Sequence, residues 1–383
     1  MPSVSLKDSG DLSDKVRSGQ YRVMIVDDSA VIRGLMSTWL GAEPAIKVVG
    51  TAGNGEMALA SMQRYDPEII ILDIEMPVMD GLTALPQFFK INPKVKVLMA
   101  STLTKRNAEI SMKALSMGAS DYVSKPESNR EVAASMSFQE DVVSKVISIV
   151  AANRLRNGGE IFKGEGSRVQ DQFIPQKSMA RSIEKRRFSK SKPSVLAIGS
   201  STGGPQALLQ VLTDLGEANV PVLITQHMPP TFTNILAKHL TGATNFTCKE
   251  AEDGDVLEAG MAYLAPGDNH MTVVERGGRK VIALNQDPPE NYCRPSVEPM
   301  MRSLIKVYGS GIFAVILTGM GHDGLEGCKK LVEAGGSLIA QDEETSVVWG
   351  MPGAVSTAGL CSGVYPLNKI GGEIKQKLMG PAK

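Results

Sequence analysis

Ser201, His227 and Asp323 have the residue types and surroundings that nucleophilic catalysis needs. A serine hydroxyl is a poor nucleophile until a base removes its proton, and a carboxylate must hold an imidazole base in the right tautomer. Ser201 is the central residue of a G-x-S-x-G pattern over 199–203, which in some hydrolases exposes a nucleophile on a sharp strand-to-helix turn. The same pattern also occurs in turns without catalysis, so its meaning depends on the other two residues.

Three apolar runs, each followed by a helical pattern, are expected to position these side chains. The runs cover 195–198, 220–226 and 312–317, and Ser201, His227 and Asp323 each come shortly after the end of one run. If the three runs form neighbouring parallel strands, the three side chains meet at one sheet edge. We therefore predict a doubly wound, mainly parallel α/β domain over residues 193–383.

The second half of the chain leaves other readings open. His270 also follows a strand-like run and could line the same pocket, whereas His239 is expected on an exposed helix face. His322 adjoins Asp323, but neighbouring side chains usually diverge. The patterns of dinucleotide-binding and P-loop turns are not met, and the spacings of zinc sites are missing. A phosphorylation-controlled binding domain without catalysis is the alternative to an enzyme.

A second group of chemically capable residues lies in the first half. Five strand-like runs alternate with helical patterns over residues 21–150, which predicts a five-stranded, doubly wound parallel sheet. Polar residues follow the runs, namely Asp27, Asp28, Asp73, Ser101 and Lys125. Each acidic residue alone could simply cap a helix, but carboxylates that converge repel each other unless a hard cation such as Mg²⁺ lies among them.

Length and composition limit the class of protein. The 383 residues suffice for two domains. Hydrophobic residues make up 42% of the chain and charged residues 21%, which is typical of a globular protein. The net charge is zero, which argues against nucleic acid as the main partner. The polar tail, residues 1–20, does not resemble a signal peptide, and no apolar run is long enough to insert in a membrane. Four separated cysteines indicate a reducing cytoplasmic setting. The basic stretch 151–192 reads as a flexible linker rather than a nucleic-acid site, because no aromatic platform accompanies its charge.

Residues 21–150 resemble the receiver domain of two-component response regulators. The matching motifs are 27–28, 72–77 with 80–81, Ser101, and 122–126. The resemblance implies that Asp73 accepts a phosphoryl group from a histidine kinase and that Mg²⁺ is bound beside it. The residues implied around Mg²⁺ are Asp28, Asp73, the backbone carbonyl of Glu75, and Asp27 through a water; the implied switch residues are Ser101, Tyr122 and Lys125.

Residues 194–380 resemble the catalytic domain of the chemotaxis protein-glutamate methylesterases. The matching runs are 198–204, 225–230, 263–267, 294–297, 317–324 and 340–352. The resemblance implies hydrolysis of glutamate γ-methyl esters on the cytoplasmic helices of chemoreceptors, with release of methanol, and deamidation of receptor glutamines. A chemotaxis histidine kinase would be the phosphodonor, and phosphorylation would shift the receiver off the catalytic pocket.

The same resemblance assigns roles to single residues. Ser201 would be the nucleophile, His227 the general base and Asp323 the carboxylate that orients it. Thr202 and the backbone N–H of Met320 would help to stabilise the transition state. No cofactor is implied for the esterase reaction itself.

Overall fold

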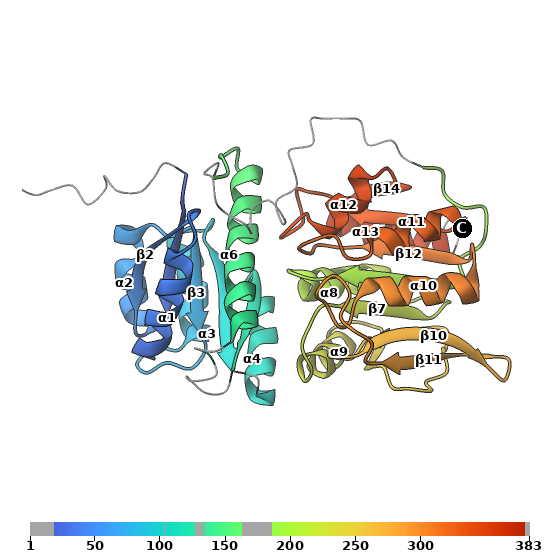
Figure 1. Cartoon of the computed structure of the whole chain (residues 1–383), viewed down its shortest axis with the longest axis horizontal. Coiled ribbons are helices and arrows are strands. Elements are labelled where there is room, and N and C mark those ends of the chain that lie inside the picture. Colours follow the sequence, from blue (N-terminus) through green and yellow to red (C-terminus); the bar gives the residue numbers. More distant parts are fainter. Residues whose placement is uncertain (1–18, 103, 127–131, 133–134, 163–185, 380–383) are drawn as a thin grey trace, which may run out of the picture.

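Two α/β domains lie side by side in the computed structural model of the chain (Figure 1). The structure describes residues 19–102, 104–126, 132, 135–162 and 186–379. Each domain is built on its own parallel sheet, with helices on both faces. The predicted fold class, two doubly wound α/β domains, is confirmed.

The receiver sheet has five parallel strands in the order β2-β1-β3-β4-β5. Its central strand is buried along its whole length, as expected for a strand covered on both faces. The strands are β1 (Tyr21–Val26), β2 (Ile46–Ala52), β3 (Ile69–Asp73), β4 (Lys96–Thr102) and β5 (Asp121–Lys125). The helices are α1 (Ala30–Gly41), α2 (Gly55–Tyr65), α3 (Gly81–Ile91), α4 (Lys105–Ser116) and α6 (Met136–Arg156).

Helix α1 shows how the sequence sets an element that positions the acidic residues. The Ser29 side chain accepts a hydrogen bond from the Ile32 backbone N–H, so it caps the helix directly after Asp27 and Asp28. Ile32, Met36 and Leu40 form the buried stripe. Val31, although apolar, lies outside this stripe and is 55% exposed.

Helix α6 continues past residue 150, where the receiver domain was expected to end. Ala151 is buried, and Arg154 in the last turn forms an ion pair with Glu68 in which Nε lies 2.6 Å from Oε1. These contacts hold the end of α6 on the sheet. Most of the expected linker, residues 163–185, lies outside the described residues, as do residues 1–18 of the tail.

The last part of the expected linker belongs structurally to the catalytic domain. The backbone N–H of Arg186 donates to the Cys361 carbonyl at 3.0 Å, and that of Ser189 donates to the Ser337 hydroxyl at 2.8 Å. Phe188 packs against Phe313 with ring centroids 6.4 Å apart. Residues 186–192 are therefore not a free hinge in this structure.

The catalytic sheet has seven strands, all paired in parallel, in the order β14-β13-β12-β6-β7-β9-β8. The three predicted strands β12, β6 and β7 are neighbours at its centre. The strands are β6 (Val195–Ser200), β7 (Val222–Gln226), β8 (Thr247–Glu250), β9 (Met261–Leu264), β12 (Ile312–Ile316), β13 (Ser337–Gln341) and β14 (Gly363–Tyr365), with the antiparallel hairpin β10 (His270–Arg276) and β11 (Arg279–Asn285) beside them. The helices are α8 (Gly204–Leu215), α9 (Phe232–Ala243), α10 (Val297–Tyr308), α11 (Leu325–Glu333), α12 (Met351–Thr357) and α13 (Leu367–Met379).

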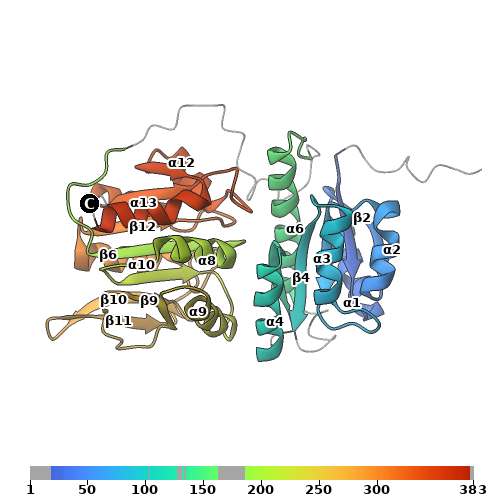
Figure 2. The same ribbon diagram turned by 180° about the vertical axis from the view of Figure 1, so that it is seen from behind.

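The domains meet where α4 of the receiver packs on α8 and α9 of the catalytic domain, and where Arg156 at the end of α6 donates to the Ser346 carbonyl (Figure 2). The Tyr122 ring stacks on the Phe232 ring with centroids 4.4 Å apart and planes at 1°. The Gln206 side-chain amide donates to the Ala119 carbonyl at 2.7 Å. Val348 joins a buried cluster otherwise made of receiver residues, and Met320 packs against that cluster.

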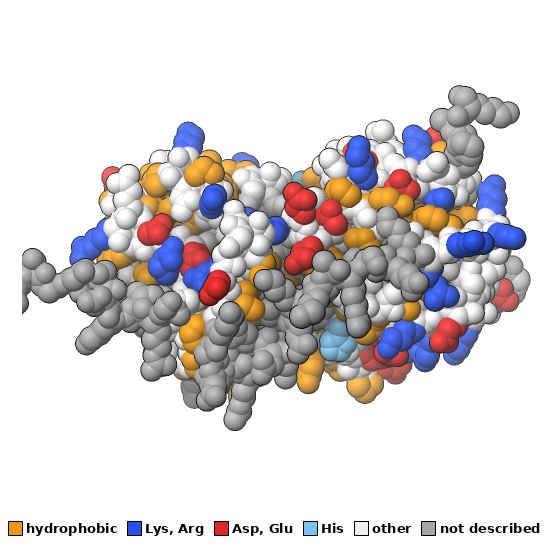
Figure 3. All heavy atoms as spheres, turned by 90° about the horizontal axis from the view of Figure 1, so that it is seen from above, with side chains coloured by type: hydrophobic (Ala, Val, Ile, Leu, Met, Phe, Trp, Pro, Cys, Tyr) orange, Lys and Arg blue, Asp and Glu red, His pale blue; other side chains and the backbone are white. Residues whose placement is uncertain are grey.

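The surface carries charges of both signs. Lysine and arginine side chains alternate with aspartate and glutamate over the face seen in Figure 3, which agrees with the zero net charge of the chain. Within the described part of the chain, no helix is both long and apolar enough to cross a membrane.

Candidate active site

Ser201 lies in the turn between β6 and α8, at the centre of the catalytic sheet. Its backbone N–H donates to the Thr318 carbonyl at 3.0 Å, so the turn is tied to the end of the neighbouring strand β12. Gly203 has φ +77°, and a Cβ there would lie 2.4 Å from Val347, so only glycine fits. Among the described residues, no side chain or backbone group forms a hydrogen bond with the Ser201 hydroxyl. The turn thus presents an unpaired hydroxyl.

Gln226, the last residue of β7, fixes the turn relative to His227. Its side chain is buried and accepts a hydrogen bond from the Ser200 hydroxyl at 2.6 Å. Its amide donates to the backbone carbonyls of Ser201 at 2.9 Å and His227 at 3.1 Å. Sequence reasoning missed this residue, although a glutamine that ends an apolar run was the available signal.

His227 and Asp323 are in direct contact. The His227 Nε2 lies 2.7 Å from Asp323 Oδ2, and the Asp323 side chain is 2% exposed. The carboxylate also accepts hydrogen bonds from the Asn291 amide at 2.8 Å, the Ser296 hydroxyl at 2.7 Å and the Val297 backbone N–H at 2.7 Å. Burial alone would raise the pKa of Asp323, but the hydrogen bonds and the charge of His227 outweigh it and lower the pKa to about 2. Asp323 is therefore ionised at neutral pH.

The second ring nitrogen of His227 faces Cys293. The Nδ1 atom lies 3.3 Å from the Cys293 Sγ. Burial lowers the pKa of His227, but Cys293 and Asp323 on its two sides raise it above its ordinary value. Sequence reasoning did not connect Cys293 with the site.

Two backbone N–H groups beside Ser201 have no acceptor among the described residues, those of Thr202 and Met320. Gly319, next to Met320, packs so closely that a Cβ there would lie 2.8 Å from the Ser201 Cβ. Unpaired donors of this kind can stabilise an oxyanion that forms next to the serine.

The other histidines have different surroundings. His270 is completely buried, its Nε2 lies 3.2 Å from the Pro288 carbonyl oxygen, and its Nδ1 accepts from the Ser296 backbone N–H at 3.2 Å. Both of its nitrogens are therefore engaged in structural contacts. His239 is half-buried on α9 rather than exposed, and His322 is exposed.

The predicted acidic cluster forms at the carboxyl edge of the receiver sheet. One carboxylate oxygen from each of Asp27, Asp28 and Asp73 lies within 4.8 Å of the others. Lys125 places its Nζ 2.6 Å from Asp73 and 3.0 Å from Asp27. Burial, together with the charge of Asp27, raises the pKa of Asp73 to about 6, although Lys125 lowers it. This all-oxygen donor set fits Mg²⁺, which prefers carboxylate ligands.

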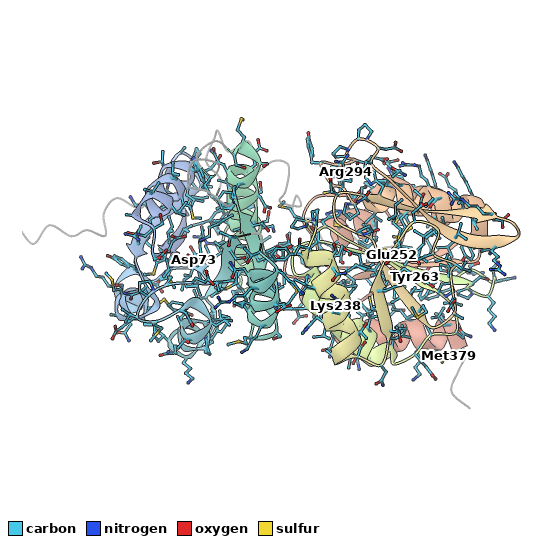
Figure 4. All side chains as sticks on the ribbon, turned by 90° about the horizontal axis from the view of Figure 1, so that it is seen from below. Asp73, Lys238, Glu252, Tyr263, Arg294 and Met379 are labelled. Atoms are coloured by element: carbon cyan, nitrogen blue, oxygen red, sulfur yellow. The ribbon has the colours of Figure 1, made fainter. Side chains whose placement is uncertain are left out.

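The remaining receiver residues have separate environments. Glu75 and Asp28 line a pocket of about 440 Å³ next to the cluster, and the Glu75 carboxylate lies 3.7 Å from Arg106. The Ser101 hydroxyl is buried and pairs with the Ser111 hydroxyl at 3.1 Å. The structure therefore pairs Lys125 with Asp73, whereas the Ser101 hydroxyl pairs with Ser111 and the Tyr122 ring stacks on Phe232. Asp73 lies in the receiver, and Arg294, which belongs to the loop before α10, lies in the other domain (Figure 4).

Comparisons with known proteins agree with this two-domain arrangement. Residues 23–137 match the response regulator receiver domain, and residues 196–374 match the CheB methylesterase family. The chain is 50% identical over 371 residues to a protein-glutamate methylesterase/protein-glutamine glutaminase of Azospirillum brasilense, covering 93% of this chain and 92% of that protein. A counterpart in Rhodospirillum rubrum is 49% identical, with 92% and 94% covered. The crystal structure of the Thermotoga maritima CheB methylesterase catalytic domain is 39% identical, with TM-score 0.47, over 48% of this chain and 98% of that one.

A receiver domain joined to an α/β domain with serine, histidine and aspartate at one sheet edge defines a hydrolase under response-regulator control. Within that class, the chain belongs to the CheB family of protein-glutamate methylesterases/protein-glutamine glutaminases. The enzyme acts in chemotaxis adaptation. Its receiver implies a phosphodonor kinase, and its catalytic domain implies methylated chemoreceptors as substrates.

Proposed function

We propose that Ser201, His227 and Asp323 carry out the hydrolysis of glutamate γ-methyl esters. The observation that carries the assignment is the 2.7 Å contact between His227 and the ionised Asp323, one strand away from the unpaired Ser201 hydroxyl. Three side chains from three adjacent strands thereby gather where parallel strands end.

The chemistry follows from these positions. His227 takes the proton of Ser201 as the oxygen attacks the ester carbonyl, and Asp323 stabilises the imidazolium that forms. The N–H groups of Thr202 and Met320 donate to the oxyanion, each worth about 3 kcal/mol of transition-state stabilisation. His227 then protonates the departing methoxide, and water cleaves the acyl-enzyme by the reverse route. With a glutamine substrate, ammonia replaces methanol as the leaving group.

Capture of the acyl-enzyme tests the nucleophile directly. We expect methylated receptor membranes, quenched in acid within the first turnover, to leave a receptor glutamyl group on the peptide that contains Ser201, detected by mass spectrometry. The neighbouring Ser200, whose hydroxyl is bound to Gln226, is the internal control. An adduct on another residue, or none when methanol release shows a burst, would contradict the assignment.

The substrates and partners follow from the family. We infer that the substrate segments are the cytoplasmic helices of chemoreceptors, that the phosphodonor is a chemotaxis histidine kinase, and that the enzyme works in the cytoplasm. Asp27, Asp28, Asp73 and the Glu75 carbonyl would hold Mg²⁺ in the receiver. When bound, the ion neutralises charge on the phosphoryl group transferred to Asp73.

Control by the receiver rests on the contact between the domains. Phe232 begins α9 and closes the loop that starts at His227, so the Tyr122–Phe232 stack joins the receiver to the segment that carries the base. Met320, whose N–H faces the oxyanion, packs on the receiver side as well. We infer that phosphorylation of Asp73 shifts the receiver away from the catalytic domain and so raises activity.

Removing the stack by Tyr122→Ala is expected to raise the unphosphorylated methylesterase activity about threefold to tenfold. An aromatic pair contributes about 0.5–1.5 kcal/mol beyond its buried area, and the truncation also loses packing that holds the closed arrangement. Initial rates of methanol release without phosphodonor are the measurement.

Tyr122→Phe keeps the ring and is the matched control, so its basal rate should equal that of the parent. In Asp73→Asn, a phosphodonor should leave the rate unchanged. If the Tyr122→Ala rate stayed at the basal level, the stack would not restrain the catalytic domain. If the phosphodonor still raised the rate of Asp73→Asn, Asp73 would not be the residue through which phosphorylation controls activity.

A further inference from the structure

The imidazole of His227 has both nitrogens occupied, and neither partner is the serine. The Nε2 atom lies 2.7 Å from Asp323 Oδ2, and the Nδ1 atom lies 3.3 Å from Cys293 Sγ. The His227 side chain is 12% exposed. Among the described residues, the Ser201 hydroxyl has no partner. The resting site therefore contains an unpaired nucleophile beside a base that is fully engaged.

The backbone around Cys293 holds the thiol in this place. Glu290 and Cys293 form an isolated antiparallel bridge, with hydrogen bonds of 3.1 and 2.9 Å between their backbones. Asn291 and Tyr292, which lie between them, both have positive φ, at 50° and 63°. The tight loop points the Asn291 amide to Asp323 and the Cys293 thiol to His227, while Tyr292 is 99% exposed.

This arrangement has a direct chemical consequence. Asp323 is ionised and accepts from Nε2, so in the neutral form of the ring Nε2 carries the proton and Nδ1 holds the lone pair. A thiol can donate to that lone pair, or lose its proton to it. If the ring instead turns over to offer Nε2 to the serine, Nδ1 leaves Cys293 as well. In either orientation the contact with Cys293 must break before His227 can accept the proton of Ser201.

We propose that Cys293 is a positioning residue that competes with Ser201 for the His227 imidazole and holds the base in a resting orientation. The proposal rests on the proposed function, because it takes His227 as the base for Ser201. Catalysis then begins only when the imidazole gives up its hydrogen bond with the Cys293 thiol and forms one with the Ser201 hydroxyl.

Because Cys293 and Asp323 both act on the pKa of His227, the contribution of Cys293 can be measured from the pH dependence of the rate. Among the described residues, Cys293 and Asp323 form the hydrogen bonds to the ring, and Asp323 in turn interacts with Glu298 of α10 and with the Glu290–Arg302 ion pair. A base must be neutral to accept a proton, so a raised pKa of His227 moves the acid limb of the rate profile to higher pH. Removing the thiol withdraws one cause of that rise, and the limb should move to lower pH.

The kinetic test compares the parent, Cys293→Ala and Cys293→Ser as full chains with saturating phosphodonor. We expect Cys293→Ala to raise kcat/KM for methanol release at neutral pH about fivefold, the equivalent of one hydrogen bond, and to move the acid limb to lower pH. Cys293→Ser also removes the thiol and should move the limb in the same direction, but it should raise the rate less, because its hydroxyl still donates to Nδ1. A residue with a merely structural role would lower the rate at every pH and leave the limb in place, and that result would overturn the proposal.

A second measurement does not depend on esterase activity. Iodoacetamide alkylates a thiolate: a C–S bond forms, the C–I bond breaks, iodide leaves, and the thiol proton passes to His227. We expect Cys293 to react faster in the parent than in His227→Gln, measured peptide by peptide by mass spectrometry, with the buried Cys248, Cys328 and Cys361 as unreactive internal controls. Equal rates would overturn the Cys293–His227 pairing.

The two measurements keep the proposals apart. Full activity in Ser201→Ala would remove the proposed nucleophile yet leave the alkylation result intact. An inactive Ser201→Ala together with unchanged pH profiles in both Cys293 variants would retain the nucleophile and reject the competition.

Discussion

Ser201→Ala will lower the rate of methanol release from methylated receptors by at least about a thousandfold. The variant keeps the oxyanion donors of Thr202 and Met320, but it lacks the hydroxyl that forms the acyl intermediate. Nucleophile, base and acid act as a unit, so the remaining His227–Asp323 pair cannot compensate. The residual rate should resemble that of water attack helped only by binding and the oxyanion donors. Methanol release under saturating phosphodonor is the measurement.

The variant should fold normally, because the Ser201 hydroxyl has no partner among the described residues and the turn is held by backbone bonds. Phosphorylation of Asp73 and unchanged thermal unfolding are the controls for an intact chain. Ser303→Ala in α10, away from the reacting atoms, is a matched serine variant that should keep most of the activity. Retention of more than about a tenth of the parental rate by Ser201→Ala would exclude a serine acyl-enzyme.

The elements that carry the reacting residues could be predicted because their signals are local. Apolar runs such as 195–198 and 312–317 have the length of buried strands, and the helices that follow have Gly203 and Gly324 as N-cap residues, both with positive φ. Parallel strands put their carboxyl ends at one edge, so the gathering of Ser201, His227 and Asp323 follows from the strand order. The domain limit at 150 was less accurate, because the pairing of Arg154 with Glu68 is a long-range contact.

The residues that surround the reacting groups could not be predicted in the same way. Gln226 acts through its side chain on two backbone carbonyls, and its position at the end of an apolar run does not show which groups that side chain will bind. Asn291, Cys293 and Ser296 reach the His227–Asp323 pair from a loop 64–69 positions after His227 in the chain. Their contacts depend on how that loop folds back, which hydrophobic periodicity does not encode. Tyr122 shows the same limit, because its partner Phe232 lies in another domain.

Asp323→Asn will lower the maximal rate of methanol release by about 10²–10⁴-fold while it moves the acid limb to lower pH. The Val297 backbone N–H cannot turn, so it requires an oxygen at the Oδ2 position, which also accepts from His227. The Ser296 hydroxyl can rotate and the Asn291 amide can turn to accept from the new NH₂ group. The asparagine therefore fits with the ring tautomer retained, and what is lost is the negative charge beside the imidazolium of the transition state.

The two effects of Asp323→Asn have one cause and opposite consequences. The carboxylate helps to raise the pKa of His227, so its loss lets the pKa fall, and the neutral base becomes available at lower pH. The same loss removes the stabilisation of the protonated ring, so the plateau of the rate profile drops. Rate profiles of the parent and the variant, measured with the same phosphodonor, separate the limb from the plateau. If the limb moved and the plateau stayed at the parental height, Asp323 would set the pKa of His227 without stabilising the transition state. That result would contradict the role assigned to Asp323.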